Sequence, residues 1–437
     1  MIKENFNFLQ SLLKRRLVKN SLYTGLALIF IGLIPFTFNF LVGRTFGAKI
    51  LGEINVTLNF CLMITIFISN FFGSAGNKFL AEFRGRENLK NFIFVLEIIF
   101  FGSISTLIIA NIILLNWWEY FSQNFSIPKE YFAPVILYIF FRTMYILLRR
   151  TLYGMDLVKN YTFNEIVSAI FMLGATAYVC FFSREDFLLK TYILSYLIFF
   201  LLCIYSIFKN FKLFKKKLNV DIDISRKQVF INYSKYGILS MIGTVASTGT
   251  GYISVIITGL SLDHTEVGIY TAALSIVSIL MFFPKLFIQV FLPEFSKLFG
   301  ENRKEKILEI FKKTSSIIFL LSTILCSGLF FISEVILSFF GDVFIEGAIV
   351  LKIIIPSVFI RMVSIPCNAF LSGTKYIMYP NIGGVIILIV SSLSWYFLIP
   401  SYNLSGVAAG YSIGIIVGVG YQIIMTFIKM NNFINSK

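Results

Sequence analysis

The chain has 437 residues, of which 57% are hydrophobic and only 14% are charged. Soluble domains carry about a quarter charged residues, so this composition excludes a soluble enzyme, a disordered protein and a secreted disulfide scaffold. Together with a mean hydropathy of +0.83, it predicts a helical protein that crosses a membrane many times. The formal net charge of +16 would suit either nucleic acid or a membrane surface, and the positions of the charges decide between them.

Twelve stretches of the chain are long and apolar enough to span a bilayer, which takes about 20 residues per helix. We expect spans at residues 21–43, 50–76, 91–115, 131–153, 161–182, 187–208, 231–258, 265–292, 314–338, 346–371, 376–399 and 403–428. The fold class predicted is therefore an all-α polytopic membrane protein. The predicted domains are an interfacial amphipathic segment over 1–20, an N-terminal six-helix bundle over 21–210, a basic cytoplasmic linker over 211–230, and a C-terminal six-helix bundle over 231–437.

The basic residues are distributed very unevenly between the two sides of these spans. The termini and every second loop hold 29 Lys and Arg, whereas the alternate loops hold six. By the positive-inside rule this asymmetry predicts that both termini are cytoplasmic. The same asymmetry accounts for the positive net charge, because basic cytoplasmic loops would lie against anionic lipid headgroups. We therefore expect membrane lipid, and no nucleic acid, as a partner.

The two halves of the chain look like repeats of one design. Both sets of six spans begin on the cytoplasmic side, which makes them parallel repeats related by a pseudo-two-fold axis along the membrane normal. Gly43 and Gly52 stand nine residues apart after the first span, and Gly259 and Gly268 stand nine apart at the corresponding place in the second half. Two facing bundles with a substrate path between them are typical of alternating access.

The sequence lacks the common nucleotide-binding and metal-binding motifs of enzymes. There is no G-x-x-x-x-G-K-[ST] for ATP and no H-E-x-x-H, and the single histidine, His264, falls in an outer loop. We interpret Asp221 and Asp223 as a charge pair of the linker, and the five cysteines as small core residues. We therefore expect no enzyme, no catalytic residue, no metal and no cofactor.

After the basic residues counted with the termini and loops are set aside, three remain within the predicted spans, namely Arg142, Lys285 and Arg361. Each costs about 2.5–3.5 kcal/mol at the centre of a membrane helix, so each should face protein or water. We expect them, with Arg44 at the outer end of the first span, to line one central cavity that binds an anionic headgroup, because Arg and Lys bind phosphate.

Polar residues on the same helix faces extend this predicted lining. They are Asn59, Asn70, Ser275, Ser278, Gln289, Ser364 and Asn368. Two acids, Glu97 and Glu165, are candidate coupling groups or ion-pair partners. The alternative is that all these residues make hydrogen bonds and ion pairs between helices. The glycines at 406, 410, 414 and 418 form a small-residue ribbon for close packing, either within the bundle or against another copy.

Several segments resemble the polysaccharide-exporting branch (Wzx-type oligosaccharide flippases) of the multidrug/oligosaccharidyl-lipid/polysaccharide (MOP) exporter superfamily. They are Gly43-Arg44 with Leu51-Gly52, Val267-Gly268-Ile269-Tyr270, Leu292-Pro293-Glu294-Phe295, Phe340-Gly341, Leu371-Ser372-Gly373 and Tyr402-Asn403-Leu404-Ser405-Gly406. In order and spacing they extend over about residues 40–410.

This resemblance implies a multi-pass protein of the cytoplasmic (inner) membrane of a prokaryote. It would move a polyprenyl-pyrophosphate-linked oligosaccharide to the outer leaflet for surface polysaccharide (O-antigen, capsule or exopolysaccharide) biosynthesis, with the polysaccharide polymerase machinery as a further candidate partner. The drive stays open between the membrane potential and exchange of protons or sodium ions. The alternatives are a multidrug/cation antiporter of the same superfamily, which should have an acidic cavity, and a membrane-embedded polysaccharide polymerase or ligase, which should have a long outer loop.

Overall fold

The computed structural model describes residues 16–217, 225–281, 295, 298–299, 303–374, 376 and 378–435. Helices make up nearly all of this part of the chain. Their bounds are α2 (Arg16–Gly85), α3 (Leu89–Glu97), α4 (Ser103–Asn124), α5 (Phe132–Gly154), α6 (Val158–Phe181), α7 (Leu188–Lys217), α8 (Arg226–Ser261), α9 (His264–Leu280), α11 (Lys304–Ser338), α12 (Gly347–Val363), α13 (Ile365–Gly373) and α14 (Met378–Asn435). A π-helix over Ile98–Gly102 joins α3 to α4, and single 3₁₀ turns lie at Lys129–Tyr131, Glu185–Phe187 and Asp342–Glu346.

The helices of the described ranges account for the twelve predicted spans. Nine of them are long and apolar enough to cross a membrane. Two of these nine, α2 and α14, each contain two predicted spans, and the shorter apolar helix α9 begins one more. The chain is therefore a multi-pass helical membrane protein, and the predicted fold class is confirmed.

Both double spans reverse direction at a residue with a positive φ. In α2 this residue is Gly47 (φ 83°), and in α14 it is Asn403 (φ 45°). Glycine and asparagine are the residues that adopt this conformation most readily. The two reversals fall where the predicted spans were separated, at residues 43–50 and 399–403.

One predicted span is broken where the sequence expectation was continuous. Within the stretch 346–371, α12 ends at Val363 and α13 begins at Ile365, with Ser364 as a turn residue between them. Pro366 lies in the first turn of α13. Proline has no amide hydrogen to donate to the preceding turn, so it starts a new helix better than it continues an old one.

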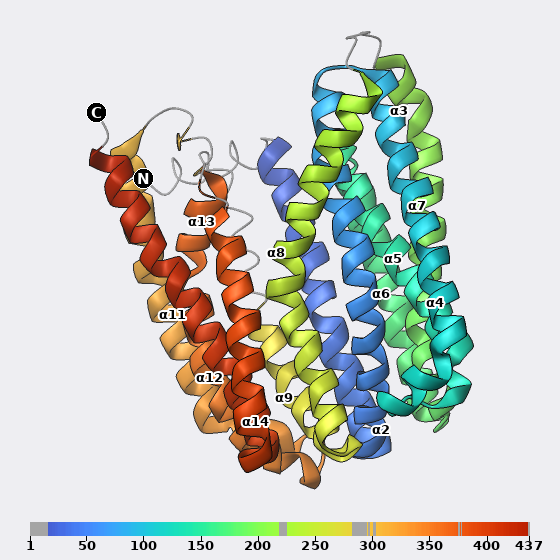
Figure 1. The fold of residues 1–437 in the computed structure, drawn as a ribbon, viewed down its shortest axis with the longest axis vertical. Helices are drawn as coiled ribbons and strands as arrows, with labels where there is room; N and C mark the ends of the chain where they lie inside the picture. Colours follow the sequence, from blue (N-terminus) through green and yellow to red (C-terminus); the bar gives the residue numbers. More distant parts are fainter. Residues whose placement is uncertain are drawn as a thin grey trace, which may run out of the picture.

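Figure 1 shows how the two halves of the chain are arranged. Helices α3–α7 lie on one side of the molecule and α11–α14 on the other, while α2 packs against α8 and α9 between them. The chain enters α2 and leaves α14 at the same end of the molecule, which we call the terminal end. We call the opposite end, with the reversals at Gly47 and Asn403 and the turn between α8 and α9, the far end.

The far end is closed by close backbone contact between the two halves. A Cβ atom on Gly52 would lie 1.8 Å from the carbonyl oxygen of His264, and one on Gly268 would lie 1.9 Å from that of Ala48. No side chain fits at either position, because real Cβ contacts are not shorter than about 3 Å. Two of the four glycines noted in the sequence therefore form a seam, the glycine seam, that joins the first half to the second.

The glycine ribbon packs within the chain. Cβ atoms at 406, 410, 414 and 418 would meet Leu398, Trp395, Ser391 and Gly383, all in the preceding arm of α14. Of the two roles that the sequence left open, the structure therefore supports packing within the bundle.

Parts of the predicted domain division lie outside the described residues. These include residues 1–15 of the amphipathic segment and residues 218–224 of the linker. Within the described part of the linker, α7 continues to Lys217 and α8 begins at Arg226. The domain boundaries at 20, 210 and 230 stay predictions.

Candidate functional site

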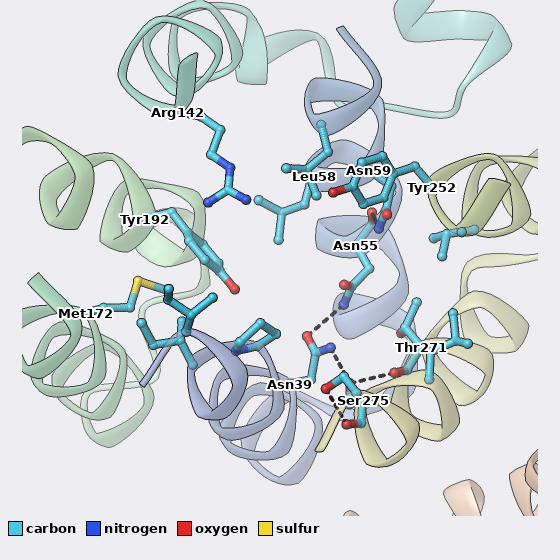
Figure 2. A pocket seen from close by; sticks show the side chains of 18 of the residues that line it. Asn39, Asn55, Leu58, Asn59, Arg142, Met172, Tyr192, Tyr252, Thr271 and Ser275 are labelled. Atoms are coloured by element: carbon cyan, nitrogen blue, oxygen red, sulfur yellow. Dashed lines mark hydrogen bonds between the residues drawn. The ribbon is translucent and has the colours of Figure 1, made fainter. Parts of the chain in front are cut away.

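A cavity of about 430 Å³ lies between the two halves of the molecule. Its volume is in the range of small-molecule sites. The first half contributes side chains from α2, α5, α6 and α7, and the second half contributes side chains from α8, α9 and α14. Figure 2 shows these side chains converging from opposite sides of the space.

Arg142 on α5 is the cation of the described cavity lining. Its guanidinium lies near two aromatic rings, with Cζ at 5.1 Å from the ring centroids of both Tyr145 and Tyr196. Nη1 donates a hydrogen bond of 2.7 Å to the hydroxyl of Tyr196. The centroids of these two rings are 4.8 Å apart, so both rings lie on the same side of the cation and stabilise its charge.

The guanidinium of Arg142 has a donor without a hydrogen-bond partner. Nε is buried without a hydrogen-bond partner. None of the ion pairs among the described residues includes Arg142. The parallel N–H groups of a guanidinium edge match two oxygens of a carboxylate or phosphate. A guanidinium that lines a cavity without a paired carboxylate is suited to bind an oxyanion.

A buried carboxyl group lies on the same side of the cavity. Glu165 on α6 is 2% exposed, and its Oε1 accepts a hydrogen bond from the hydroxyl of Tyr145. Its other oxygen, Oε2, has no partner. Arg149, two turns from Arg142 on α5, lies near the same tyrosine, with Cζ at 5.8 Å from the ring centroid. Two guanidinium groups and one carboxyl therefore surround Tyr145.

Four tyrosines form an aromatic wall around Arg142. Tyr138 and Tyr192 are joined edge to face at 6.0 Å, and Tyr145 and Tyr196 lie 4.8 Å apart between ring centroids. Tyr138 lies one helical turn before Arg142, so both face the cavity from α5. Tyr192 and Tyr196 are likewise one turn apart and face the cavity from α7. All four tyrosines line the cavity.

The second half lines the cavity mainly with neutral groups. They include Gly251 and Tyr252 on α8, Thr271, Ser275 and Ser278 on α9, and Tyr411 on α14. The hydroxyls of Ser275 and Ser278 donate to carbonyls of their own helix, those of Thr271 and Ser275. The charge of the described lining thus comes from the first half and the small hydroxyls from the second.

A short chain of hydrogen bonds joins the halves across the cavity wall. Asn55 donates to Oδ1 of Asn39 at 3.1 Å, and Asn39 donates from Nδ2 to the hydroxyl of Ser275 at 2.5 Å (Figure 2). The two asparagines belong to α2 and the serine to α9. We call these three residues the Asn-Asn-Ser bridge.

The cavity brings together five of the predicted site residues. These are Arg142, Glu165, Asn59, Ser275 and Ser278. Lys285 and Gln289 lie outside the described residues, so their placement stays a prediction.

Two predicted cations lie elsewhere. Arg361 on α12 is half-buried, and its Nη2 donates at 3.4 Å to the carbonyl of Ser247 on α8 instead of lining the cavity. Arg44 is exposed at the far end and donates at 3.3 Å to the carbonyl of Phe339. The expectation that Arg142 and Arg361 meet in one chamber therefore differs from the structure, because the faces of α5 and α12 that carry them point to different neighbours.

Four more predicted residues are absent from this cavity lining, and three of them have structural contacts. Asn70 accepts a hydrogen bond of 2.6 Å from Arg150, which lies within α5. Ser364 donates to the carbonyl of Arg361 at the end of α12, and the amide of Asn368 donates to the carbonyl of Ser364. Glu97 is the last residue of α3, directly before the π-helix.

Sequence reasoning missed several lining residues, above all Asn39, Tyr192 and Tyr196. A signal for the tyrosines was present in their four-residue spacing. Asn39 had no comparable signal, because a single asparagine in an apolar span does not reveal which helix it faces. Among the described residues, no group of three His, Cys, Asp or Glu side chains is arranged to hold a metal ion.

Comparison with known proteins identifies the architecture. The structure resembles an inward-facing multidrug resistance MATE family transporter of the MOP superfamily, with a TM-score of 0.78 at 12% identity over 94% of this chain and 99% of the other. The chain has the MATE fold. The MatE family model matches residues 240–396, which lie in the second half.

Two other solved structures share this fold. The lipid II flippase MurJ in an inward closed conformation aligns with a TM-score of 0.72 at 16% identity, over 94% of this chain and 90% of that one. A MOP superfamily transporter from Pyrococcus furiosus, described by a reversed polarity of its binding pocket, aligns with a TM-score of 0.60 at 12% identity, over 96% of each chain. No curated protein sequence matches this chain.

Proposed function

We propose that the protein is a flippase that moves a polyprenyl-pyrophosphate-linked oligosaccharide across the cytoplasmic membrane of a prokaryote by alternating access. The observation that carries this proposal is Arg142, a cation without an ion-pair partner among the described residues, in a cavity between two helical halves. The MATE fold, shared with the lipid II flippase MurJ and with multidrug transporters, supports a transport role.

The chemistry of the cavity favours a ligand that is both anionic and hydroxylated. An oxyanion would complete the hydrogen bonds of Arg142, whose burial makes an unpaired charge costly. The ligand's hydroxyl groups would meet the asparagine and serine side chains, and the faces of its sugar rings would meet the tyrosine wall. The lipid tail would stay in the bilayer, because the cavity of about 430 Å³ is too small for a long polyprenyl chain.

The closed glycine seam supports a state in which the cavity is shut toward the far end. The distribution of Lys and Arg predicts that this end faces outward. In the proposed cycle the headgroup enters from the cytoplasmic side, the halves rock about the cavity, and the seam opens to release the headgroup outward.

A cation antiporter of the same superfamily is the second candidate. It is favoured by one observation, the buried Glu165 with a free Oε2. Arg142 and Arg149 lie around the same tyrosine, so the local charge opposes a cationic ligand unless Glu165 acts alone.

The test is lipid binding by the purified full-length chain in detergent. The probes are undecaprenyl pyrophosphate, undecaprenol, which lacks the oxyanions, and ethidium, a cationic dye. We expect undecaprenyl pyrophosphate to bind and the other two to bind more weakly. Arg142→Ala should weaken pyrophosphate binding about tenfold or more, since a hydrogen bond to a charged group contributes about 1.5–3 kcal/mol. Arg142→Lys should restore only part of it, because an ammonium lacks the paired donors.

Arg184→Ala is the matched control, since this arginine stacks on Phe187 outside the cavity. It should bind undecaprenyl pyrophosphate like the unaltered chain. Equal binding by the Arg142→Ala variant would contradict the site, and ethidium binding that is lost in a Glu165→Gln variant would favour the antiporter.

A further inference from the structure

We propose that the Asn-Asn-Ser bridge is a hydroxyl-binding subsite whose internal hydrogen bond holds the far end closed until a hydroxylated ligand replaces it. This inference rests on the proposed function only in naming a sugar as the ligand. The role of the bridge in closing the far end stands on the contacts alone.

The bridge crosses the boundary between the two halves inside the cavity wall. Asn39, Asn55 and Ser275 are 8%, 6% and 4% exposed, and all three line the cavity. Asn55 and Ser275 are each also bonded to their own helix, Asn55 to the carbonyl of Leu51 at 2.9 Å and Ser275 to that of Thr271 at 2.7 Å. Among the described residues, the side-chain amide of Asn39 is bonded to the two partners of the bridge and has no such bond within its own helix.

Asn55 and Ser275 lie on the same helices as the glycine seam and close to it. Asn55 lies three residues from Gly52, about one turn along α2, and Ser275 lies seven residues from Gly268, about 10 Å along α9. Gly52 and Gly268 are the residues whose backbones meet the opposite half at the far end. When the far end opens, α2 and α9 must separate there, and the Asn39–Ser275 hydrogen bond, which joins these helices only two turns away, is broken.

Breaking this bond is unfavourable in an empty cavity. The amide of Asn39 would lose its acceptor in a largely apolar surrounding, where an unpaired donor is costly. A hydroxyl group both donates and accepts, so a sugar in the cavity can bond to Asn39 and to Ser275 after they part. An apolar chain or a quaternary ammonium offers neither bond. The bridge would thus couple opening of the far end to the presence of a hydroxylated ligand.

The test measures opening at the seam through a reporter cysteine. Val56 is 1% exposed and lies against Gly259 of the other half, so Val56→Cys reports opening of the far end. The five native cysteines are replaced, and full-length chains in liposomes are treated with a membrane-impermeant maleimide. We expect Ser275→Ala and Asn39→Ala to raise the labelling rate roughly fivefold without ligand, the factor for losing one ordinary hydrogen bond.

Two matched variants distinguish loss of the bridge from a general loss of stability. Thr258→Val removes a buried hydroxyl that bonds only to Ser254 of its own helix, and it should leave labelling unchanged. Ser275→Thr keeps the acceptor for Asn39 and should keep labelling slow. Equal labelling in the Ser275→Ala, Asn39→Ala and Thr258→Val variants would overturn the role of the bridge, whatever the outcome of the lipid-binding test.

A ligand arm tests the hydroxyl specificity. Undecaprenyl pyrophosphate carrying N-acetylglucosamine should speed labelling of the chain that carries only the reporter substitution, whereas undecaprenyl pyrophosphate without sugar should not. Ser275→Ala should remove this difference. If both lipids speed labelling equally, the bridge does not recognise hydroxyls and the inference fails, while a pyrophosphate-binding flippase would still stand.

Discussion

The side chains around Tyr145 show how one residue organises a charged site in an apolar interior. Its ring lies beside Arg142 and Arg149, and its hydroxyl is the only described partner of the Glu165 carboxyl. The tyrosine therefore keeps a carboxyl and two guanidinium groups close together without a direct ion pair.

Removing the hydroxyl of Tyr145 should destabilise the protein. In a Tyr145→Phe variant both oxygens of Glu165 would be buried without a hydrogen bond, at a cost of about 1–3 kcal/mol. We expect a lower apparent melting temperature of the purified chain in detergent. The double variant Tyr145→Phe with Glu165→Leu should regain much of the loss, because it removes the unsatisfied carboxyl. An unchanged melting temperature in the single variant would mean that Glu165 finds another donor.

The sequence indicated Arg142 as a site residue but gave the same indication for Arg361. Both are central in an apolar span, and insertion cost alone requires only that each avoid lipid. Helical periodicity shows which residues share a face with the arginine, yet it does not show which helix that face meets. Arg361 donates to a backbone carbonyl of α8, whereas Arg142 lines the cavity between the two halves. That difference depends on tertiary packing.

At the scale of elements, α14 shows how a small-residue ribbon fixes the position of a helix. Gly418 lies against the preceding arm, where a Cβ would come within 2.4 Å of Ile387 Cγ1 and 2.5 Å of the Gly383 carbonyl oxygen. Gly420, two residues later in the same helix, has open space around it. Alanine substitutions at the two positions therefore distinguish the effect of tight packing from the effect of helix propensity.

Gly418→Ala should lower stability, and Gly420→Ala should not. Overpacking of a tight contact costs about 1–3 kcal/mol, whereas alanine at an open helical position is neutral or favourable. The measurement is thermal unfolding of each full-length variant in the same detergent. If both variants melt alike, the two arms of α14 can separate without loss, and the ribbon is not what holds them.

The elements themselves were largely predictable, because twelve apolar stretches and the reversals between them follow from hydropathy and bilayer thickness. The break between α12 and α13 was missed although Pro366 signals it, since the apolar run continues through the proline. The partner of the glycine ribbon was not predictable either. Spacing shows that a close approach exists but leaves open whether the partner belongs to the same chain.

For the whole molecule, the proposed cycle predicts that charge on the ligand couples its transport to the membrane potential. The cavity lies between the halves, and the basic residue of its described lining is Arg142 in the first half. In the proposed cycle the negative headgroup crosses from the cytoplasmic side to the outer side. With an inside-negative potential, each negative charge that moves outward gains about 2.3 kcal/mol per 100 mV.

We therefore expect an inside-negative potential of 100 mV to favour outward accumulation of a labelled polyprenyl-pyrophosphate glycolipid on the order of fiftyfold per charge moved. Liposomes that contain oriented protein and a potassium gradient with valinomycin supply the potential, and fluorescence quenching from outside follows the headgroup. Reversing the gradient should reverse the direction. A neutral polyprenyl glycolipid of the same sugar is the control and should respond to neither sign. Accumulation that follows an imposed proton or sodium gradient at zero potential would instead assign the drive to ion exchange, for which Glu165 is the buried acid of the described cavity lining.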